Sequence, residues 1–321
     1  MKKSVAVIYG GYSSEFEISK KSANTIYSNI DTELFNPFLV QLTKGDWIVE
    51  IDGAKCSINK NNFTYALNGL EIRFDVAFIA IHGTPGEDGK LQSYFDMIDM
   101  PYVNSGVLPS SLSFNKWACN QFLNSFGINI AKSVLLRQND VINVNEIGAK
   151  LAFPCFVKPN DGGSSFGISK VYKLEFLEKA ISDAFLEGEE VVIESTLVGR
   201  EVTCGMYNNG NDIVAFPITE ILTDSDFFDT EAKYSSATSE ITPADISREL
   251  TLEIQSVSRK IYQVLGLKSI ARVDFIIDVN HVVNVIEVNT IPGMTAESLV
   301  PQQIVAAGLE LKMVLTQILR K

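Results

Sequence analysis

Short apolar runs alternate with amphipathic stretches along the first hundred residues. The apolar runs predict three buried strands, at 4–9, 38–42 and 75–81. A helical pattern follows the first of them, at 18–30. This alternation favours a small parallel sheet with helices on both faces. Ligands of such sheets bind in the loops after the strands, so the candidate site loops are GGYSSEFE (10–17) and HGTPGEDGK (82–90).

Turn-forming residues at 101–109 indicate a boundary, beyond which the pattern is richer in strands. We expect helices at 113–126, 174–185 and 246–265. We expect strands at 156–158, 168–171, 191–194, 201–207 and 213–218. Two further apolar runs, 272–278 and 282–288, predict a hairpin that turns near Asn280. The polar segment 223–241 has no sustained period, which is typical of a functional lid or a disordered loop.

Oxygen-bearing side chains gather on this predicted hairpin. Glu287 and Asn289 are two residues apart and therefore lie on one face of an extended strand. If the two strands pair, Asp274 joins them, and the three donors suit one or two Mg²⁺ ions that bridge nucleotide phosphates. Pro292 and Gly293 would then turn the chain so that backbone N–H groups face an anion. The alternative is an edge strand with solvated polar residues.

The loop KPNDGGSSFG (158–167) follows an apolar strand and exposes backbone N–H groups that can surround a phosphate. It is not a Walker A loop, because its lysine precedes the glycines, and a plain hairpin turn is the alternative. Lys116, Lys158 and Lys233 could together clamp phosphates, although any single lysine more often lies on the solvated surface. Glu194 and Glu201 could bind ribose hydroxyls or serve only as solvated caps.

Composition and charge narrow the possible classes of protein. The 321 residues are 46% hydrophobic and 21% charged, as in a soluble globular protein of two or three domains. Neither a signal peptide nor a membrane span is evident, so we expect a cytoplasmic protein with no membrane partner. A net charge of −12 argues against nucleic acid as a partner. The four scattered cysteines and two histidines disfavour disulfides and a zinc site.

Taken together, these segments resemble the D-alanine–D-alanine ligases of the ATP-grasp superfamily. The resemblance is carried, in order, by GGYSSEFEIS (10–19), HGTPGEDGKLQ (82–92), VKPNDGGSSFGISKV (157–171), EAKY (231–234), ARVDF (271–275) and IEVNTIPGMTAESLVP (286–301). It implies an α/β (α+β) ATP-grasp fold, in which an N-terminal parallel α/β domain precedes central and C-terminal α+β subdomains. The expected spans are 1–105, 106–203 and 204–321.

The implied activity is ATP-dependent ligation of two D-alanines through an acyl phosphate, for peptidoglycan precursor synthesis. ATP and two Mg²⁺ ions, for which Mn²⁺ can substitute, are the implied cofactors, and a homodimer is the usual assembly. The lid residue Tyr234 matches relatives that use an amine nucleophile, which favours the dipeptide over a D-alanyl-D-lactate ester. The alternatives are a D-alanine–D-lactate ligase, another ATP-grasp carboxylate–amine ligase, or a catalytically silent nucleotide-binding protein.

The resemblance also implies a role for each matching residue. Glu15, with the neighbourhood of His82, would orient the amino group of the first D-alanine. Arg272 and the backbone N–H of Gly293 would stabilise the activated carboxylate and the tetrahedral intermediate. The carboxylate of the second D-alanine would be held by Ser298 and Leu299.

Three further groups of residues are implied around the nucleotide. Ser164 and Tyr234 would link to Glu15 and close the site. The phosphates would be bound by Lys116, Lys158 and Lys233, with Ser164 and Ser165 in the loop around them. Adenine and ribose would be held by Glu194, Ser195, Leu197 and Glu201. The metal ligands would be Asp274, Glu287 and Asn289, the last also touching the nucleotide. Ser195 stands where family members often have Lys or Arg, a contact usually made through the backbone.

Overall fold

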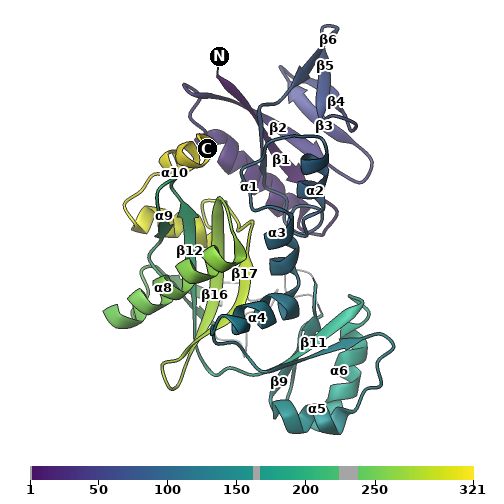
Figure 1. Ribbon diagram of the computed structural model, residues 1–321, viewed down its shortest axis with the longest axis vertical. Coiled ribbons are helices and arrows are strands. Elements are labelled where there is room, and N and C mark those ends of the chain that lie inside the picture. The colour runs from purple at the N-terminus through teal and green to yellow at the C-terminus, as the bar shows by residue number, and fades with distance from the viewer. Residues whose placement is uncertain (1, 162–166, 224–237) are drawn as a thin grey trace.

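Three β-sheets follow one another along the long axis of the molecule. The computed structural model describes residues 2–161, 167–223 and 238–321. In Figure 1 the N-terminal sheet lies at the top, the C-terminal sheet in the middle and the central sheet at the bottom, with helix α4 (Lys116–Ser125) at the junction of the last two. The predicted residues Ser164, Ser165, Lys233 and Tyr234 lie outside the described residues.

The N-terminal sheet has seven strands in the order β6-β5-β4-β3-β2-β1-β7. The predicted strands are confirmed as a parallel core of β1 (Lys3–Gly10), β2 (Phe35–Leu42) and β7 (Val76–Ile79). Antiparallel strands that the sequence analysis did not predict extend this core: β3 (Trp47–Ile51), β4 (Ala54–Asn59), β5 (Thr64–Leu67) and β6 (Leu70–Arg73). Short chain reversals join these strands, so no crossover helix is needed.

Helices cover both faces of the parallel core, as predicted. Along β1, Val5 and Val7 are buried in the cluster that contains α1 (Phe16–Asn29), whereas Ala6 and Ile8 face the cluster that contains α2 (Lys90–Met97). This alternation is the two-residue period of a strand buried on both faces. The loops that follow β1 and β7 lie at the edge of this sheet nearest the other two sheets (Figure 1).

The chain passes through two helices into the four-stranded central sheet. The predicted helix 113–126 is instead α3 (Val107–Phe114) and α4, which break at Asn115. The Asn115 side chain accepts a hydrogen bond from Ala118 N at 2.9 Å and so caps α4. The sheet contains, in order, β10 (Ser169–Val171), β9 (Cys155–Pro159), β11 (Glu190–Ser195) and β8 (Ser133–Arg137). The helical segments of this part are α5 (Val144–Leu151), η1 (Leu174–Phe176) and α6 (Leu177–Ala184).

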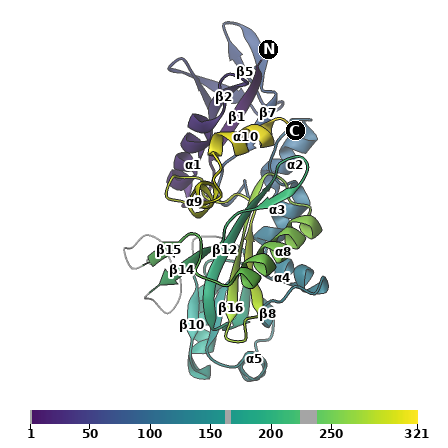
Figure 2. The ribbon, with the colours of Figure 1, turned by 90° about the vertical axis from the view of Figure 1, so that its left-hand side faces the viewer.

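The C-terminal sheet carries the hairpin that the sequence predicts. Strands β16 (Ile270–Asp278) and β17 (Val283–Asn289) are antiparallel neighbours, and β16 also pairs with β12 (Gly199–Asn208). The other strands are β13 (Ile213–Ala215), β14 (Thr219–Thr223) and β15 (Thr238–Ile241). The helices among its described residues are α8 (Arg248–Leu265), α9 (Leu299–Ala306) and α10 (Leu311–Leu319). Figure 2 shows β14 and β15 projecting to one side of this sheet. The domain boundaries at 105 and 203 remain predictions.

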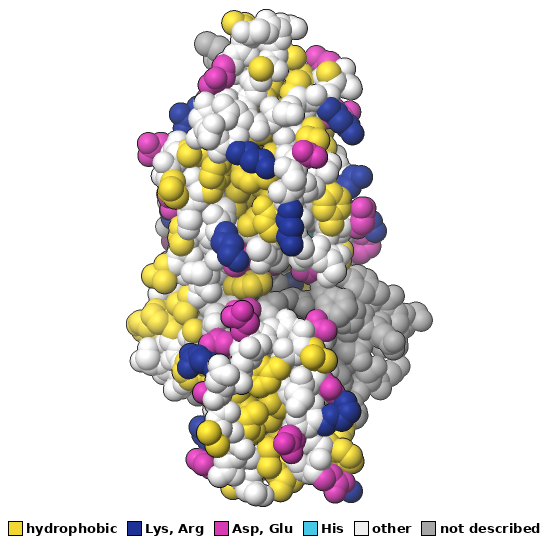
Figure 3. All heavy atoms as spheres, turned by 90° about the vertical axis from the view of Figure 1, so that its right-hand side faces the viewer, with side chains coloured by type: hydrophobic (Ala, Val, Ile, Leu, Met, Phe, Trp, Pro, Cys, Tyr) yellow, Lys and Arg dark blue, Asp and Glu magenta, His cyan; other side chains and the backbone are white. Residues whose placement is uncertain are grey.

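The surface adds two observations. On the face shown in Figure 3, lysine and arginine side chains are interspersed with acidic ones, and its described residues form no continuous basic band. Within the described ranges, no helix has both the length and the apolar character needed to cross a membrane.

Candidate functional site

Two adjacent hollows lie where the three sheets meet. A cleft of about 1130 Å³ is lined by residues of the central and C-terminal sheets and of the loops that follow β1 and β7. A second hollow of about 420 Å³ is lined by residues of the N-terminal and C-terminal parts. Six residues line both hollows, which therefore share a wall: Glu15, Phe114, Lys116, Arg272, Glu287 and Leu299.

The predicted site residues that are described all line one hollow or the other. The larger cleft contains Lys116, Lys158, Glu194, Ser195, Leu197, Glu201, Arg272, Asp274 and Glu287. The smaller hollow contains Glu15, His82, Asn289, Gly293, Ser298 and Leu299. The structure thus brings together side chains from segments up to about 280 residues apart, although their individual roles remain predictions.

The strand pair β16–β17 places the predicted oxygen donors side by side. Asp274 lies directly opposite Glu287, and Arg272 lies opposite Asn289, with a register shift after Asp274. The guanidinium of Arg272 donates from Nε to Asp274 Oδ1 at 2.8 Å and from Nη2 to Oδ2 at 2.7 Å. The Thr203 hydroxyl on β12 donates to the same Oδ1. Asp274 is therefore held rigidly within the cleft, not in bulk solvent.

Arg272 carries a permanent positive charge at the junction of the hollows. Burial works against this charge, but the carboxylates of Asp274, Glu287 and Glu87 outweigh it and raise the pKa of Arg272. A buried guanidinium held in this way can stabilise negative charge that develops on a bound carboxyl group.

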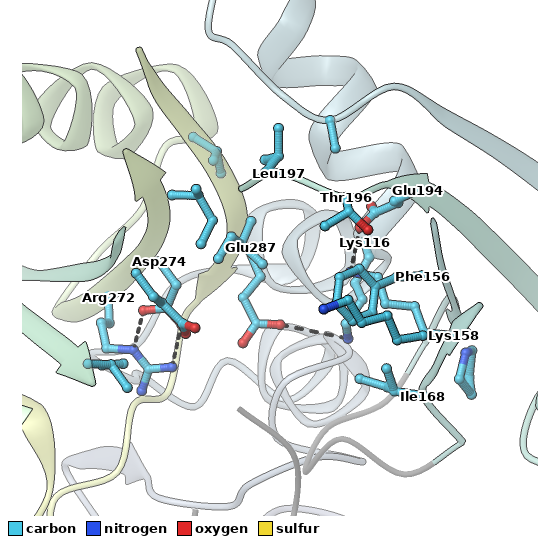
Figure 4. Close-up of a pocket in the computed structure, with 18 of the residues that line it drawn as sticks. Lys116, Phe156, Lys158, Ile168, Glu194, Thr196, Leu197, Arg272, Asp274 and Glu287 are labelled. Atoms are coloured by element: carbon cyan, nitrogen blue, oxygen red, sulfur yellow. Dashed lines mark hydrogen bonds and ion pairs between the residues drawn. The ribbon is translucent and has the colours of Figure 1, made fainter. Parts of the chain in front are cut away.

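The wall of the cleft opposite the β16–β17 pair combines lysine side chains with an apolar surface. Lys158 Nζ on β9 lies 2.7 Å from Glu194 Oε2 on β11, and both side chains are about nine-tenths buried. Lys116 Nζ, at the start of α4, is 4.0 Å from Glu287 Oε2. In Figure 4 Glu287 lies between the Arg272–Asp274 pair and the group formed by Lys158, Glu194 and Phe156. The apolar side chains lining this region include Ala131, Phe156, Ile168, Leu197 and Val285. An apolar wall next to two lysines can hold a ligand with a flat ring and an anionic tail.

The oxygen donors fit a hard cation that a bound ligand helps to coordinate. No three His, Cys, Asp or Glu side chains of the described chain gather into a metal site by themselves. The strand pair supplies two carboxylates, Asp274 and Glu287, and the amide of Asn289. Mg²⁺ commonly takes one or two protein carboxylates and completes its shell with substrate phosphates and water. These residues therefore fit Mg²⁺ as part of a nucleotide complex.

The smaller hollow begins at two loops of the N-terminal part. Ser13 Oγ donates to the carbonyl of His82 at 2.9 Å, which ties the loop after β1 to the loop after β7 and sets Glu15 beside them. The His82 ring lies 3.1 Å from the hydroxyl of Ser22 on α1. Burial lowers the pKa of His82, and the opposing effect of Glu15 does not reverse this, so the imidazole is neutral near pH 7.

The opposite side of this hollow is the start of α9. Ser298 precedes the first residue of the helix, and its hydroxyl accepts a hydrogen bond from Thr295 N at 3.0 Å. A Cβ atom at Gly293 would lie 2.9 Å from that hydroxyl, so the close approach favours glycine. The free backbone N–H groups of a helix N-terminus attract an anion such as a carboxylate.

Sequence reasoning missed Glu87, although it lies within the motif HGTPGEDGK. Glu87 Oε2 accepts a hydrogen bond from Gly83 N at 2.6 Å, and the residue lines the smaller hollow. Burial raises the pKa of Glu87 to about 8, against the lowering effect of the Gly83 bond, and the charges of Glu15 and Glu287 add to the rise. The sequence did contain a signal for Glu87, namely an acidic residue among glycines just after a predicted strand, but only His82 of this motif was assigned a role.

Comparison with known proteins agrees with this geometry. The family model described as D-ala D-ala ligase N-terminus matches residues 4–105. The model described as D-ala D-ala ligase C-terminus matches residues 122–320.

Individual relatives match along their whole length. The chain is 51% identical over 321 residues to a D-alanine--D-alanine ligase of Azobacteroides pseudotrichonymphae, covering 99% of each chain. It is 48% identical over 321 residues to a D-alanine--D-alanine ligase of Bacteroides fragilis, again covering 99% of each chain. Among solved structures, the VanG D-Ala:D-Ser ligase of Enterococcus faecalis superposes with a TM-score of 0.90 at 32% identity, over 100% of this chain and 99% of that one. These matches confirm the expected ATP-grasp fold class.

Proposed function

The chain belongs to the D-alanine–D-alanine ligase family, and on that premise we propose that it joins two D-alanines at the expense of ATP, through an acyl phosphate. The product, D-alanyl-D-alanine, would serve peptidoglycan precursor synthesis. The observation that carries the proposal is the position of Arg272, beside Asp274 and Glu287, at the junction of the two hollows. A reaction between a nucleotide and an amino acid needs such a junction.

The larger cleft is the proposed ATP site. The purine would lie against the apolar wall that includes Phe156 and Ile168, with Glu194 to Leu197 and Glu201 near the adenine and ribose. The phosphates would extend toward Lys116 and Lys158. Asp274, Glu287 and Asn289 would hold Mg²⁺, which neutralises phosphate charge when it is bound.

The smaller hollow is the proposed site of the two D-alanines. Glu15 would hold the ammonium group of the first D-alanine, and the N-terminus of α9 would hold the carboxylate of the second. A carboxylate oxygen of the first D-alanine would attack the γ-phosphorus, with ADP leaving. The amine of the second would then attack the acyl carbon, with phosphate leaving. Arg272 and the N–H of Gly293 would stabilise the oxyanion formed at that carbon.

D-Alanine is the proposed second substrate because the relatives near 50% identity are named D-alanine--D-alanine ligases. The solved D-Ala:D-Ser ligase makes D-serine the alternative to test, beside D-lactate. Purified protein would be incubated with ATP and D-alanine, alone and with either competitor, and the products identified by mass spectrometry. D-Alanyl-D-alanine as the main product is expected, whereas an ester or a D-serine dipeptide would overturn the assignment. If D-alanine does not increase ADP release, a catalytically silent nucleotide-binding protein would be favoured.

The assembly and its location are part of the proposal. We expect a cytoplasmic homodimer, as is usual among proteins that resemble this one. Light scattering on the purified protein would measure the mass directly, against 35.4 kDa for one chain. A single-chain mass at micromolar concentration would contradict the dimer without affecting the proposed reaction.

A further inference from the structure

The last residue of β17, Asn289, lies between an acidic and a basic partner. With its NH₂ group toward Glu87, the amide donates to Oε1 at 2.9 Å, and its oxygen accepts from Arg272 Nη2 at 3.2 Å. The opposite orientation would set the amide oxygen against a carboxylate and the NH₂ group against a guanidinium. The two partners therefore select one of the two orientations of this amide.

Glu87 is itself held firmly at this point. Its second oxygen accepts from Gly83 N at 2.6 Å, and its own N–H donates to the Gly83 carbonyl at 2.9 Å. A Cβ atom at Gly86 would lie 2.3 Å from the carbonyl oxygen of Ile81, so the loop is packed tightly against the end of its strand. A carboxylate fixed on such a loop can impose an orientation on a neighbour instead of following it.

We propose that Glu87 is a positioning residue, which orients the Asn289 amide so that its oxygen faces Arg272, at the junction of the two hollows. The contact joins a loop of the N-terminal part to the strand that carries Glu287, so it also couples the two halves of the site. The inference rests on the proposed function in one respect, namely that the ligand bound next to the Asn289 oxygen is a magnesium–nucleotide complex.

The isosteric change Glu87→Gln keeps the size of the side chain and alters only the hydrogen bonds that can orient Asn289. A glutamine has one acceptor oxygen, so it cannot accept from both Gly83 N and the Asn289 amide. If it keeps the Gly83 bond, its NH₂ group faces Asn289 and favours the reversed amide. Loss of a residue that orients a metal ligand typically costs 10–100-fold in metal affinity. We expect the Mg²⁺ concentration that half-saturates binding of a non-hydrolysable ATP analogue to rise about tenfold.

The change Asn289→Asp supplies the reciprocal test. Alone, it places a carboxylate 2.9 Å from that of Glu87. Combined with Glu87→Gln, it restores a donor facing an acceptor, while an oxygen still faces Arg272. Glu87→Gln should therefore raise the half-saturating Mg²⁺ concentration in the parent and lower it in the Asn289→Asp background. A role in local packing alone would not reverse the sign of the effect.

Calorimetric titration of each protein with the analogue, at about pH 9 so that the Glu87 carboxyl with its raised pKa is ionised and at a series of Mg²⁺ concentrations, provides the measurement. The matched control is Asp88→Asn, which removes a neighbouring carboxylate that binds Thr84 and Lys90 instead. This control should match the parent, and thermal unfolding without ligand should show that every variant is folded. An unchanged Mg²⁺ dependence in Glu87→Gln, or an effect of equal sign in both backgrounds, would overturn the inference.

One further variant distinguishes this inference from the proposed function. Glu287→Gln should lose Mg²⁺-dependent binding if the metal assignment is correct. If Glu287→Gln loses it while Glu87→Gln binds like the parent, only the role of Glu87 is wrong. If the parent itself binds the analogue equally well without Mg²⁺, the metal assignment fails and the inference fails with it.

Discussion

The two walls of the large cleft differ in how their charges are balanced. On the central wall, one lysine, Lys158, is matched by one carboxylate, Glu194, at 2.7 Å and among apolar neighbours. On the C-terminal wall, two cations, Arg272 and Lys116, face the acidic groups of Asp274, Glu287 and Glu87. The first wall is a closed pair, whereas the second sets three acidic groups against two cations, and this crowding contributes to the raised pKa of Glu87. The comparison indicates that the C-terminal wall is built to receive additional cationic charge.

The largest expected effect follows from removing Arg272, the buried cation of the C-terminal wall, which is called the acidic wall below. Arg272→Ala should lower turnover by about a thousandfold, because a donor to the developing oxyanion is lost. ATP affinity should change by less than about tenfold, since the nucleotide is held mainly by the other wall. Steady-state kinetics and analogue binding would separate the two quantities. The matched control is Arg137→Ala, on an exposed arginine paired with Glu190. Equal losses in binding and turnover would show that Arg272 serves the nucleotide instead.

Glu287→Gln tests the excess of acid directly. The substitution keeps the size of the side chain but removes a charge opposite Asp274. We expect turnover and affinity for Mg²⁺-ATP to fall together by about 10–100-fold, because a metal ligand is weakened. Folding should survive, since the residue lies near the end of β17, and thermal unfolding would verify this. Activity near the parent level would contradict the metal assignment.

The balanced wall should respond in a different way. Glu194→Gln leaves the buried lysine without its partner, which typically costs about 3 kcal/mol of unfolding free energy. Replacing the pair together, with Lys158→Met and Glu194→Leu, should return most of that stability and still abolish tight ATP binding. Urea unfolding and analogue titration would measure the two outcomes. Full stability in Glu194→Gln would mean that the pair contributes little to the fold.

The hairpin that forms the acidic wall was predictable, because its signal is local. Its two apolar runs and the donor residues at their ends lie within one short stretch of sequence. The missed strands β3 to β6 also carried local signals. Asp52-Gly53 and Asn68-Gly69 both have positive φ angles at their turns, as expected for tight hairpins. These dipeptides could have identified the antiparallel part of the first sheet.

Other features depend on contacts that no local pattern encodes. The break at Asn115 coincides with hydrogen bonds from Lys116 N and Trp117 N to Asn160, which follows β9 some 45 residues further along the chain. The position of Glu87 matters because Asn289, some 200 residues further along, lies beside it. Propensity and periodicity describe neighbours in sequence, so such tertiary contacts remain invisible to them.

The smallest expected effect concerns His82, a buried and neutral side chain that lines the smaller hollow. Because burial lowers the pKa of His82, the unfolded chain takes up a proton near pH 6.5 that the folded chain does not. The free energy of unfolding should therefore fall as pH drops below about 6.5, by at most about 1.4 kcal/mol per pH unit. His82→Gln, which can still bond to Ser22, should lack this part of the pH dependence. Urea unfolding of both proteins at pH 7.5 and 5.5 would measure the difference. Identical slopes would mean that the ring is protonated in the fold, where Glu15 would then be its partner.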